Sequence, residues 1–266
     1  MPEIERLNVQ EQFAVLRKRF EEDPTRETFN ALICGEAGTG KTYLLKTARK
    51  PVLVAGFDPG GHVTLREEIG KGEVIYLNFA PDNPFKPWAF RQFASEFQDL
   101  ESKGIFNHIA TFALDSSTMF AEAILNYFVA QRGAAGKTPN GKTDYLPQKT
   151  ELRNWLNKIL ALPCDVIVTG HLESEKDEVT GRLTYRYATT GKGTFLFPAL
   201  FDEIYVMSAE ETSQGIKRSI ITASTGRYLA RSRLATNGKI EPYEAPNIKN
   251  ILKKAGYPTE DKPLYV

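Results

Sequence analysis

Eight consecutive residues in the first fifth of the chain have the types and the spacing of a loop that holds phosphate groups. Their sequence, GEAGTGKT, matches the pattern G-x-x-x-x-G-K-[ST] at every fixed position. Glycines let the backbone of such a loop fold so that its N–H groups converge on phosphate oxygens. Lys41 would then reach the β- and γ-phosphates, and the Thr42 hydroxyl would reach a Mg²⁺ ion. The residues expected to bind the nucleotide are Gly35, Glu36, Ala37, Gly38, Thr39, Gly40, Lys41, Thr42 and Tyr43.

The residues on either side of this loop predict the elements that would hold it in place. Residues 29–34 form an apolar run that predicts a buried parallel strand, and residues 43–50 predict a helix that begins directly after the loop. The first turn of that helix would add free N–H groups and the positive end of its dipole. A glycine-rich bend without a ligand is the alternative interpretation, but the full match between a strand and a helix favours phosphate binding.

Polar residues at the ends of three further predicted strands are candidates for catalysis, together with Lys41. Asp115 ends an apolar strand, which is the Walker B arrangement, and its carboxylate would meet Mg²⁺ across from Thr42. Asp58 ends a second strand, where it either belongs to the site or caps the turn that follows. His171 ends a third, and there we expect a residue that senses the γ-phosphate rather than an ordinary loop histidine.

The composition is that of an ordinary globular chain and excludes several classes of function. Of its 266 residues, 41% are hydrophobic and 25% are charged, which allows one α/β domain with additions. The net charge is +1, so any surface that binds a polyanion must be local. Cys34 and Cys164 lie in apolar runs, so we expect no disulfide, no thiolate metal site and a reducing cytoplasm. Without an apolar run of about 18 residues, we expect no membrane partner.

Two polar segments carry basic residues that could contact a polyanion, although both could instead be solvated faces. Residues 132–144 break all periodicity and predict a mobile loop, whereas the alternation within residues 173–193 predicts a β-hairpin. A third candidate lies between Glu211 and Glu241, where the chain has no acidic residue. The basic residues of the first two segments are Lys137, Lys142, Lys176, Arg182, Arg186 and Lys192; those of the third are Lys217, Arg218, Arg227, Arg231, Arg233 and Lys239.

The order of these motifs resembles that of the RecA-type recombinase core. The phosphate loop is followed by a strand ending FDPGG, a Walker B strand ending LDSS, a glycine-rich break, a helix, the strand VIVTGH, a polar hairpin ending TTGKG and the strand FDEIYVMS. The order is similar in particular to that of compact phage and prophage RecA-like ATPases counted among single-strand-annealing proteins, the Sak group. The resemblance covers residues 28–235. The alternation of strands and helices predicts a mostly parallel α/β sheet with helices on both faces, and a β-hairpin extension.

The resemblance implies an ATP-binding protein that uses Mg²⁺, binds single-stranded DNA and promotes annealing and homologous recombination as a homo-oligomeric ring or filament. Asp115 would be its Walker B residue and His171 would sense the γ-phosphate. Segments 132–144 and 173–193 fall where the two DNA-binding loops of RecA proteins lie. The resemblance therefore implies that the basic residues of these two segments bind DNA. A single-stranded-DNA-binding protein would be a further partner, and a phage-encoded chain would act in the bacterial host cytoplasm.

Segments at both ends flank this RecA-like ATPase core. Residues 8–22 predict an amphipathic helix that would either cover the sheet or dock on a neighbouring subunit. The last part of the chain predicts a short helix followed by proline-rich extended chain. We therefore divide the sequence into an N-terminal helical segment (1–27), the core (28–240) and a C-terminal tail (241–266).

The chain departs from the RecA pattern after its second strand. RecA relatives usually have a glutamate there that activates the attacking water, whereas this chain reads Asp58-Pro59-Gly60-Gly61. Either Asp58 takes this role, or Glu67 or Glu68 reaches in, or hydrolysis is weak. Phosphoryl transfer depends mostly on positioning and charge stabilisation, so loss of this group would slow hydrolysis without abolishing nucleotide binding.

Two other functions could use the same phosphate loop. An ATPase of DNA packaging or helicase loading would need a glutamate beside Walker B, where this chain has Ser116 and Ser117. A small-molecule kinase would need lid arginines, for which residues 227–233 are candidates, although the long polar hairpin does not suit it.

Overall fold

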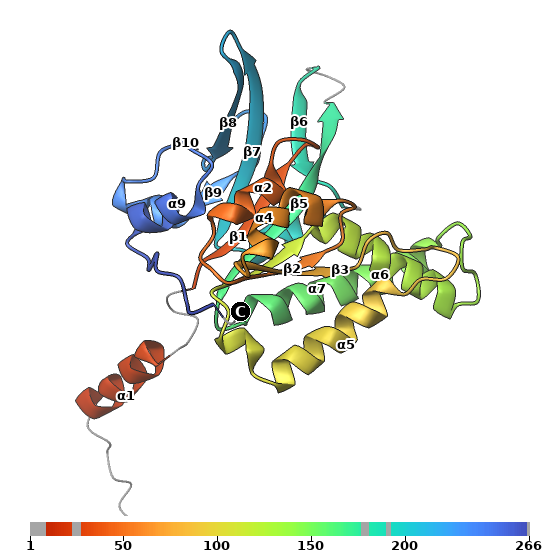
Figure 1. Ribbon diagram of the computed structural model, residues 1–266, viewed down its shortest axis with the longest axis horizontal. Coiled ribbons are helices and arrows are strands. Elements are labelled where there is room, and N and C mark those ends of the chain that lie inside the picture. Colours follow the sequence, from red (N-terminus) through yellow and green to blue (C-terminus); the bar gives the residue numbers. More distant parts are fainter. Residues whose placement is uncertain (1–8, 23–27, 177–180, 190–192, 265–266) are drawn as a thin grey trace, which may run out of the picture.

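The computed structural model describes residues 9–22, 28–176, 181–189 and 193–264, and a largely parallel β-sheet forms its centre (Figure 1). Within these residues, six strands run parallel in the order β7-β1-β5-β4-β2-β3. Antiparallel pairs add β8 and β10 beyond β7, β6 beside β5 and β9 beside β7. The strands are β1 Asn30–Gly35, β2 Val52–Gly56, β3 Val74–Asn78, β4 Thr111–Asp115, β5 Asp165–Lys176, β6 Leu183–Tyr187, β7 Glu203–Thr212, β8 Gly215–Ile221, β9 Arg231–Ser232 and β10 Tyr243–Glu244.

The central strands read as continuous apolar runs because both faces of the sheet are covered. Successive side chains of a strand point to opposite faces. In β1, Leu32 and Cys34 accordingly belong to one buried cluster, and Ala31 and Ile33 belong to the other.

Long helices cover one face of the sheet, and short elements with one C-terminal helix cover the other (Figure 1). On the first face, rings of Phe93, Phe120 and Trp155 pack with their centroids 4.9–6.5 Å apart. The predicted α/β fold with two covered faces is confirmed. The first face holds α5 Ala89–Ser102, α6 Ser117–Gln131 and α7 Leu146–Leu160; α2 Lys41–Leu44, α3 Gly61–Thr64, α4 Arg66–Gly70 and α9 Ile248–Ala255 are on the side of the phosphate loop, and α8 Gly193–Leu196 follows β6. Short turns of helix are η1 Leu45–Thr47, η2 Ile105–Asn107, η3 Gly141–Tyr145, η4 Pro198–Leu200 and η5 Leu234–Asn237.

The two end segments behave differently. Helix α1, Val9–Glu21, stands apart from the sheet in Figure 1, and its Phe13 and Leu16 side chains are 58% and 55% exposed. It therefore does not cover the sheet, which was one of the two roles expected for it. The tail instead packs on the core, because β10 pairs with β8 and the apolar face of α9 is buried.

Two antiparallel hairpins extend beyond the body of the sheet (Figure 1). One is formed by β5 and β6, as the alternation of residues 173–193 predicted. The other is formed by β7 and β8, and β7 continues to Thr212, past the end of the predicted strand FDEIYVMS. Among the described residues, no helix has both the length and the apolar character needed to cross a membrane.

Candidate nucleotide site

The phosphate loop connects the end of β1 to the start of α2 and requires glycine at three positions. Gly38 and Gly40 have φ values of 79° and 100°, which side-chain-bearing residues rarely adopt. A Cβ added to Gly35 would lie 2.6 Å from the Thr39 hydroxyl oxygen. These glycines let the backbone turn tightly enough to face a phosphate group.

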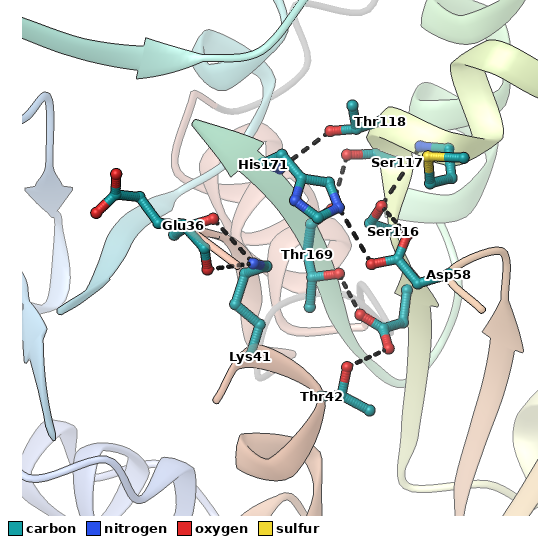
Figure 2. Close-up of polar contacts among 12 residues, drawn as sticks. Glu36, Lys41, Thr42, Asp58, Ser116, Ser117, Thr118, Thr169 and His171 are labelled. Carbon is teal, nitrogen blue, oxygen red and sulfur yellow. Dashed lines mark hydrogen bonds and ion pairs between the residues drawn. The ribbon is translucent and has the colours of Figure 1, made fainter. Parts of the chain in front are cut away.

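Lys41 is buried beneath this loop and is held by its backbone. Its Nζ donates hydrogen bonds to the carbonyl oxygens of Gly35 at 2.8 Å and Glu36 at 3.0 Å (Figure 2). Burial lowers the pKa of Lys41, and the negative charges of Asp58 and Asp115 partly oppose that shift. The ammonium group is thus held against the backbone of the loop, where it could contact phosphate oxygens.

Asp115, the last residue of β4, is completely buried and accepts two short hydrogen bonds. Thr42 Oγ1 donates to one carboxylate oxygen at 2.7 Å, and Thr169 Oγ1 donates to the other at 2.5 Å (Figure 2). Burial raises the pKa of Asp115, whereas these two hydrogen bonds favour its ionised form and act in the opposite direction. The structure therefore brings together the two residues that the sequence nominated for Mg²⁺.

These groups fit a Mg²⁺ ion that is shared with a nucleotide. The hydroxyl of Thr42 and the carboxylate of Asp115 are hard oxygen donors, which Mg²⁺ prefers. No group of three or more His, Cys, Asp or Glu residues in the described part of the chain could hold a metal ion by itself. The ion would complete its coordination with phosphate oxygens and water, as Mg²⁺ commonly does.

Asp58 and His171 form a second polar pair next to Asp115. Ser116 Oγ donates to Asp58 Oδ1 at 2.6 Å, and His171 Nε2 lies 3.2 Å from Asp58 Oδ2 (Figure 2). A carboxylate can only accept, so His171 carries its proton on Nε2 in this contact. Burial alone would raise the pKa of Asp58, but the hydrogen bonds from His171 and Ser116 outweigh it, and the pKa is lowered. Asp58 is therefore held as an oriented carboxylate within the site.

The two glutamates considered as replacements for the missing water-activating residue are on α4. Glu68 forms an ion pair with Lys46 at 3.1 Å, and Glu67 precedes it on the same short helix. The carboxylates that act electrostatically on Lys41 are instead Asp58, Asp115 and Glu36. Among the alternatives left open by the sequence, this arrangement favours Asp58.

Thr169 was missed in the sequence although a signal for it was present. It lies two residues before His171 on β5, so both side chains project from the same face of that strand. Its hydrogen bond to Asp115 and the contact of His171 with Asp58 tie β5 to the ends of both β4 and β2.

A cavity of about 360 Å³ adjoins the phosphate loop and would suit the nucleoside part of a ligand. Arg218 of β8 reaches this cavity, and its Cδ lies 3.4 Å from a Cβ built on Gly40. Tyr43 is 60% exposed at the same place. The cavity is lined by Gly40, Tyr43, Leu44, Met207, Arg218 and Pro246.

The segment between Glu211 and Glu241, which has no acidic residue, does not form a single basic surface. Arg231 donates a hydrogen bond to the carbonyl oxygen of Phe201, and Arg233 forms an ion pair with Asp202 at 2.8 Å. These two arginines support local structure, whereas Arg218 lines the cavity beside the phosphate loop. The basic residues of 217–239 therefore lie in different environments, and contact of this segment with a phosphate group or a subunit stays a prediction.

Side-chain contacts organise the segment between α6 and α7, which the sequence predicted to be a mobile loop. Arg132 forms a two-pronged ion pair with the buried carboxylate of Asp144, with a shortest distance of 2.6 Å. The Asn140 side chain accepts hydrogen bonds from the backbone N–H groups of residues 142 and 143. Lys137 and Lys142 remain exposed on this organised loop.

The basic residues of the other predicted DNA-binding segment lie on the β5–β6 hairpin, away from that loop (Figure 1). Arg186 forms an ion pair with Glu175 at 2.8 Å and stacks over the Phe195 ring at 4.8 Å. Lys176 ends β5, and Arg182 precedes β6 next to Gly226. Lys192 lies outside the described residues. The structure thus places these candidates in two separate regions.

The fold and the site together define a RecA-like P-loop ATPase. Strand β5 lies between the phosphate-loop strand β1 and the Walker B strand β4, and its Thr169 and His171 complete the polar site. The chain belongs to the family described as AAA domain (AAA_24), whose model matches residues 28–234. The family match agrees with the RecA-like ATPase that the sequence predicted. It does not show that the chain belongs to the single-strand-annealing group.

Among solved structures, the chain is similar to the KaiC-like protein PH0186 from the hyperthermophilic archaeon Pyrococcus horikoshii OT3. The two share 15% sequence identity with a TM-score of 0.41, over 72% of this chain and 76% of that one. None of the curated proteins matches the chain.

Proposed function

We propose that this chain binds ATP with Mg²⁺, hydrolyses it weakly and uses the bound nucleotide to control its binding of single-stranded DNA. In this role it promotes strand annealing and homologous recombination. The observation that supports the proposal most directly is the path of β5, Asp165–Lys176, which carries Thr169 and His171 of the site and continues into the hairpin with β6 that holds Lys176 and Arg186.

Strand β5 connects the candidate nucleotide site directly to the β5–β6 hairpin. Thr169 and His171 contact Asp115 and Asp58 at distances of 2.5 and 3.2 Å. The same strand continues, paired with β6, to Lys176, which is about 16 Å from His171 at the rise of an extended strand. A nucleotide that moves His171 would therefore also shift the hairpin that carries Arg186.

The proposed hydrolysis relies on charge stabilisation. Bound Mg²⁺ would neutralise charge that develops on the phosphate oxygens. Lys41 would add a second positive charge there, and Asp58 would orient the attacking water while His171 and Ser116 fix its carboxylate. Because the pKa of Asp58 is lowered, it is a poor proton acceptor, which fits weak hydrolysis.

Assembly and location belong to the same proposal. Helix α1 exposes Phe13 and Leu16, and an amphipathic helix with exposed apolar side chains would suit a contact between subunits of a homo-oligomeric ring or filament. A phage or prophage origin, the bacterial host cytoplasm as location and a single-stranded-DNA-binding protein as partner follow from the single-strand-annealing assignment and are proposed with it.

The proposal is tested by fluorescence anisotropy with a labelled oligothymidine, measured without nucleotide, with MgADP and with a non-hydrolysable ATP analogue plus Mg²⁺. We expect the analogue to change DNA affinity by about 5- to 150-fold, the usual range of coupling between two sites. The His171→Ala variant should bind both ligands but lose this coupling.

Nucleotide binding without single-stranded DNA binding in any state would refute the proposal. Turnover stimulated only by duplex DNA would favour a packaging motor, and phosphoryl transfer to a small molecule would favour a kinase. The kinase alternative has little structural support, because Arg231 and Arg233, two of its candidate lid arginines, are bound to Phe201 and Asp202.

A further inference from the structure

An exposed phenylalanine lies against the organised loop between α6 and α7. Phe85 is 74% exposed, the largest fraction among the described large apolar residues that are exposed. Its ring nevertheless has a fixed neighbour, since a Cβ added to Gly136 would collide with it. Two loops far apart in sequence, 79–88 and 132–145, therefore meet at this contact and present an aromatic ring to solvent.

Hydrogen bonds hold both loops in place around this ring. Asp82 accepts from the backbone N–H of Trp88 at 3.0 Å and from the Asn126 side chain at 3.0 Å, which ties the first loop to α5 and α6. The Asn83 side chain accepts from the N–H of Phe85 at 3.0 Å. The ion pair between Arg132 and Asp144 organises the second loop. The ring is thus pre-organised, which lowers the entropy cost of binding a flat partner.

Basic residues outnumber acidic residues on these two loops. Lys86, Lys137 and Lys142 are exposed, and none forms an ion pair with a carboxylate in the described part of the chain. The acidic residues of the two loops are already engaged, since Asp144 pairs with Arg132 and Asp82 accepts backbone N–H groups. A fixed aromatic ring with free lysines beside it has the composition of a single-strand nucleic-acid contact.

We infer that Phe85 stacks on a base of single-stranded nucleic acid while Lys86, Lys137 and Lys142 contact its phosphates. The inference rests on the proposed function and names the residues that carry it. Double-stranded nucleic acid would not stack on Phe85 in this way, because its bases are already stacked on one another. The inference also makes the loop between α6 and α7, rather than the β5–β6 hairpin, the region where bases are held.

The test separates the base contact from the phosphate contact with two labelled single strands of equal length, oligothymidine and its abasic analogue. Phe85→Ala should weaken oligothymidine binding by roughly 5- to 150-fold, the range of one lost base–aromatic stack. Binding of the abasic strand should be unchanged, and Phe85→Trp should bind oligothymidine at least as well as the wild type. Tyr243→Ala, which removes another exposed ring, serves as the matched control.

Replacing the lysines should affect both strands, because both strands carry the phosphates that the lysines contact. The Lys137→Ala, Lys142→Ala double variant should weaken both strands, and it should flatten the dependence of log affinity on log salt by about one per lost contact. Phe85→Ala should leave that slope unchanged, because the ring releases no counterion.

The possible failures can be told apart. If the wild type binds no single-stranded DNA, the proposed function itself fails. If the wild type binds but Phe85→Ala changes neither strand, or weakens both equally, the stacking role is wrong while the proposed function stands. The stacking role is also wrong if Phe85→Ala changes the sedimentation of the DNA-free protein, because the ring then serves contact between copies of the chain.

Discussion

Replacing Thr169 with Val should weaken the site while leaving its shape intact. Valine is close in size to threonine but lacks the hydroxyl that donates to Asp115 at 2.5 Å. Asp115 is completely buried, so water cannot replace the lost donor. A hydrogen bond to a charged group contributes about 1.5–3 kcal/mol. For a chain of this size that loss corresponds to a fall in Tm of roughly 3–12 °C.

The effect should depend on pH with a defined sign. Burial raises the pKa of Asp115 in the folded protein, so in the range between the unfolded and folded pKa values the folded state holds the proton more tightly. Stability contributed by this group therefore falls as pH rises through that range. Thr169→Val should raise the folded pKa further, so its destabilisation should be largest at neutral pH and should shrink as acid protonates Asp115.

Thermal and urea unfolding at neutral and acidic pH measure this effect, with Thr169→Ser as the control that keeps the hydroxyl. Titration of MgATP should also show a higher Mg²⁺ requirement for the valine variant, because Asp115 must be ionised to bind the cation. If Thr169→Val unfolds like the wild type at neutral pH and needs no more Mg²⁺, the assigned role of this hydrogen bond is wrong.

Three further outcomes are expected. Asp115→Asn should keep much of its nucleotide binding but lose Mg²⁺ dependence and turnover, because an amide is a poorer ligand for a hard cation; Mg²⁺-dependent turnover at the wild-type rate would place the Walker B residue elsewhere. Asp58→Asn should lower turnover more than it lowers ATP affinity, as steady-state kinetics would show, and an unchanged rate would remove Asp58 from catalysis. The Arg182→Ala, Arg186→Ala double variant should weaken single-strand binding and flatten its salt slope while ATP binding stays constant; if Arg227→Ala alone loses DNA instead, the hairpin is not the contact.

The phosphate loop and the strand ends could be predicted because their signals are local. A matched motif between a strand and a helix fixes Lys41 and Thr42, and an apolar run fixes where Asp115 emerges. Parallel strands then bring their carboxyl ends to one edge, which is why Asp58 and His171 meet. Thr169 could have been found by the same reasoning, through its spacing from His171.

The loops and basic surfaces could not be predicted because their contacts are not local. The glycines and the proline in residues 132–144 predicted a mobile loop. The ion pair between the buried carboxylate of Asp144 and Arg132, which organises this loop, leaves no pattern in the sequence. The contact of Phe85 with Gly136 joins separate parts of the chain. A count of the charges in residues 217–239 also does not say where each basic side chain points. Arg218 lines the cavity beside the phosphate loop, whereas Arg233 pairs with Asp202.

The most direct test of the central claim is the affinity of the folded Lys41→Ala protein for a fluorescent ATP analogue with Mg²⁺. Lys41 is the buried cation of the phosphate loop, held by two backbone carbonyl oxygens. Loss of its charge-assisted contacts should weaken binding by about 10- to 150-fold while the thermal unfolding curve stays that of a folded protein. Unchanged affinity in a folded Lys41→Ala variant would contradict the assignment of this chain as a P-loop ATPase.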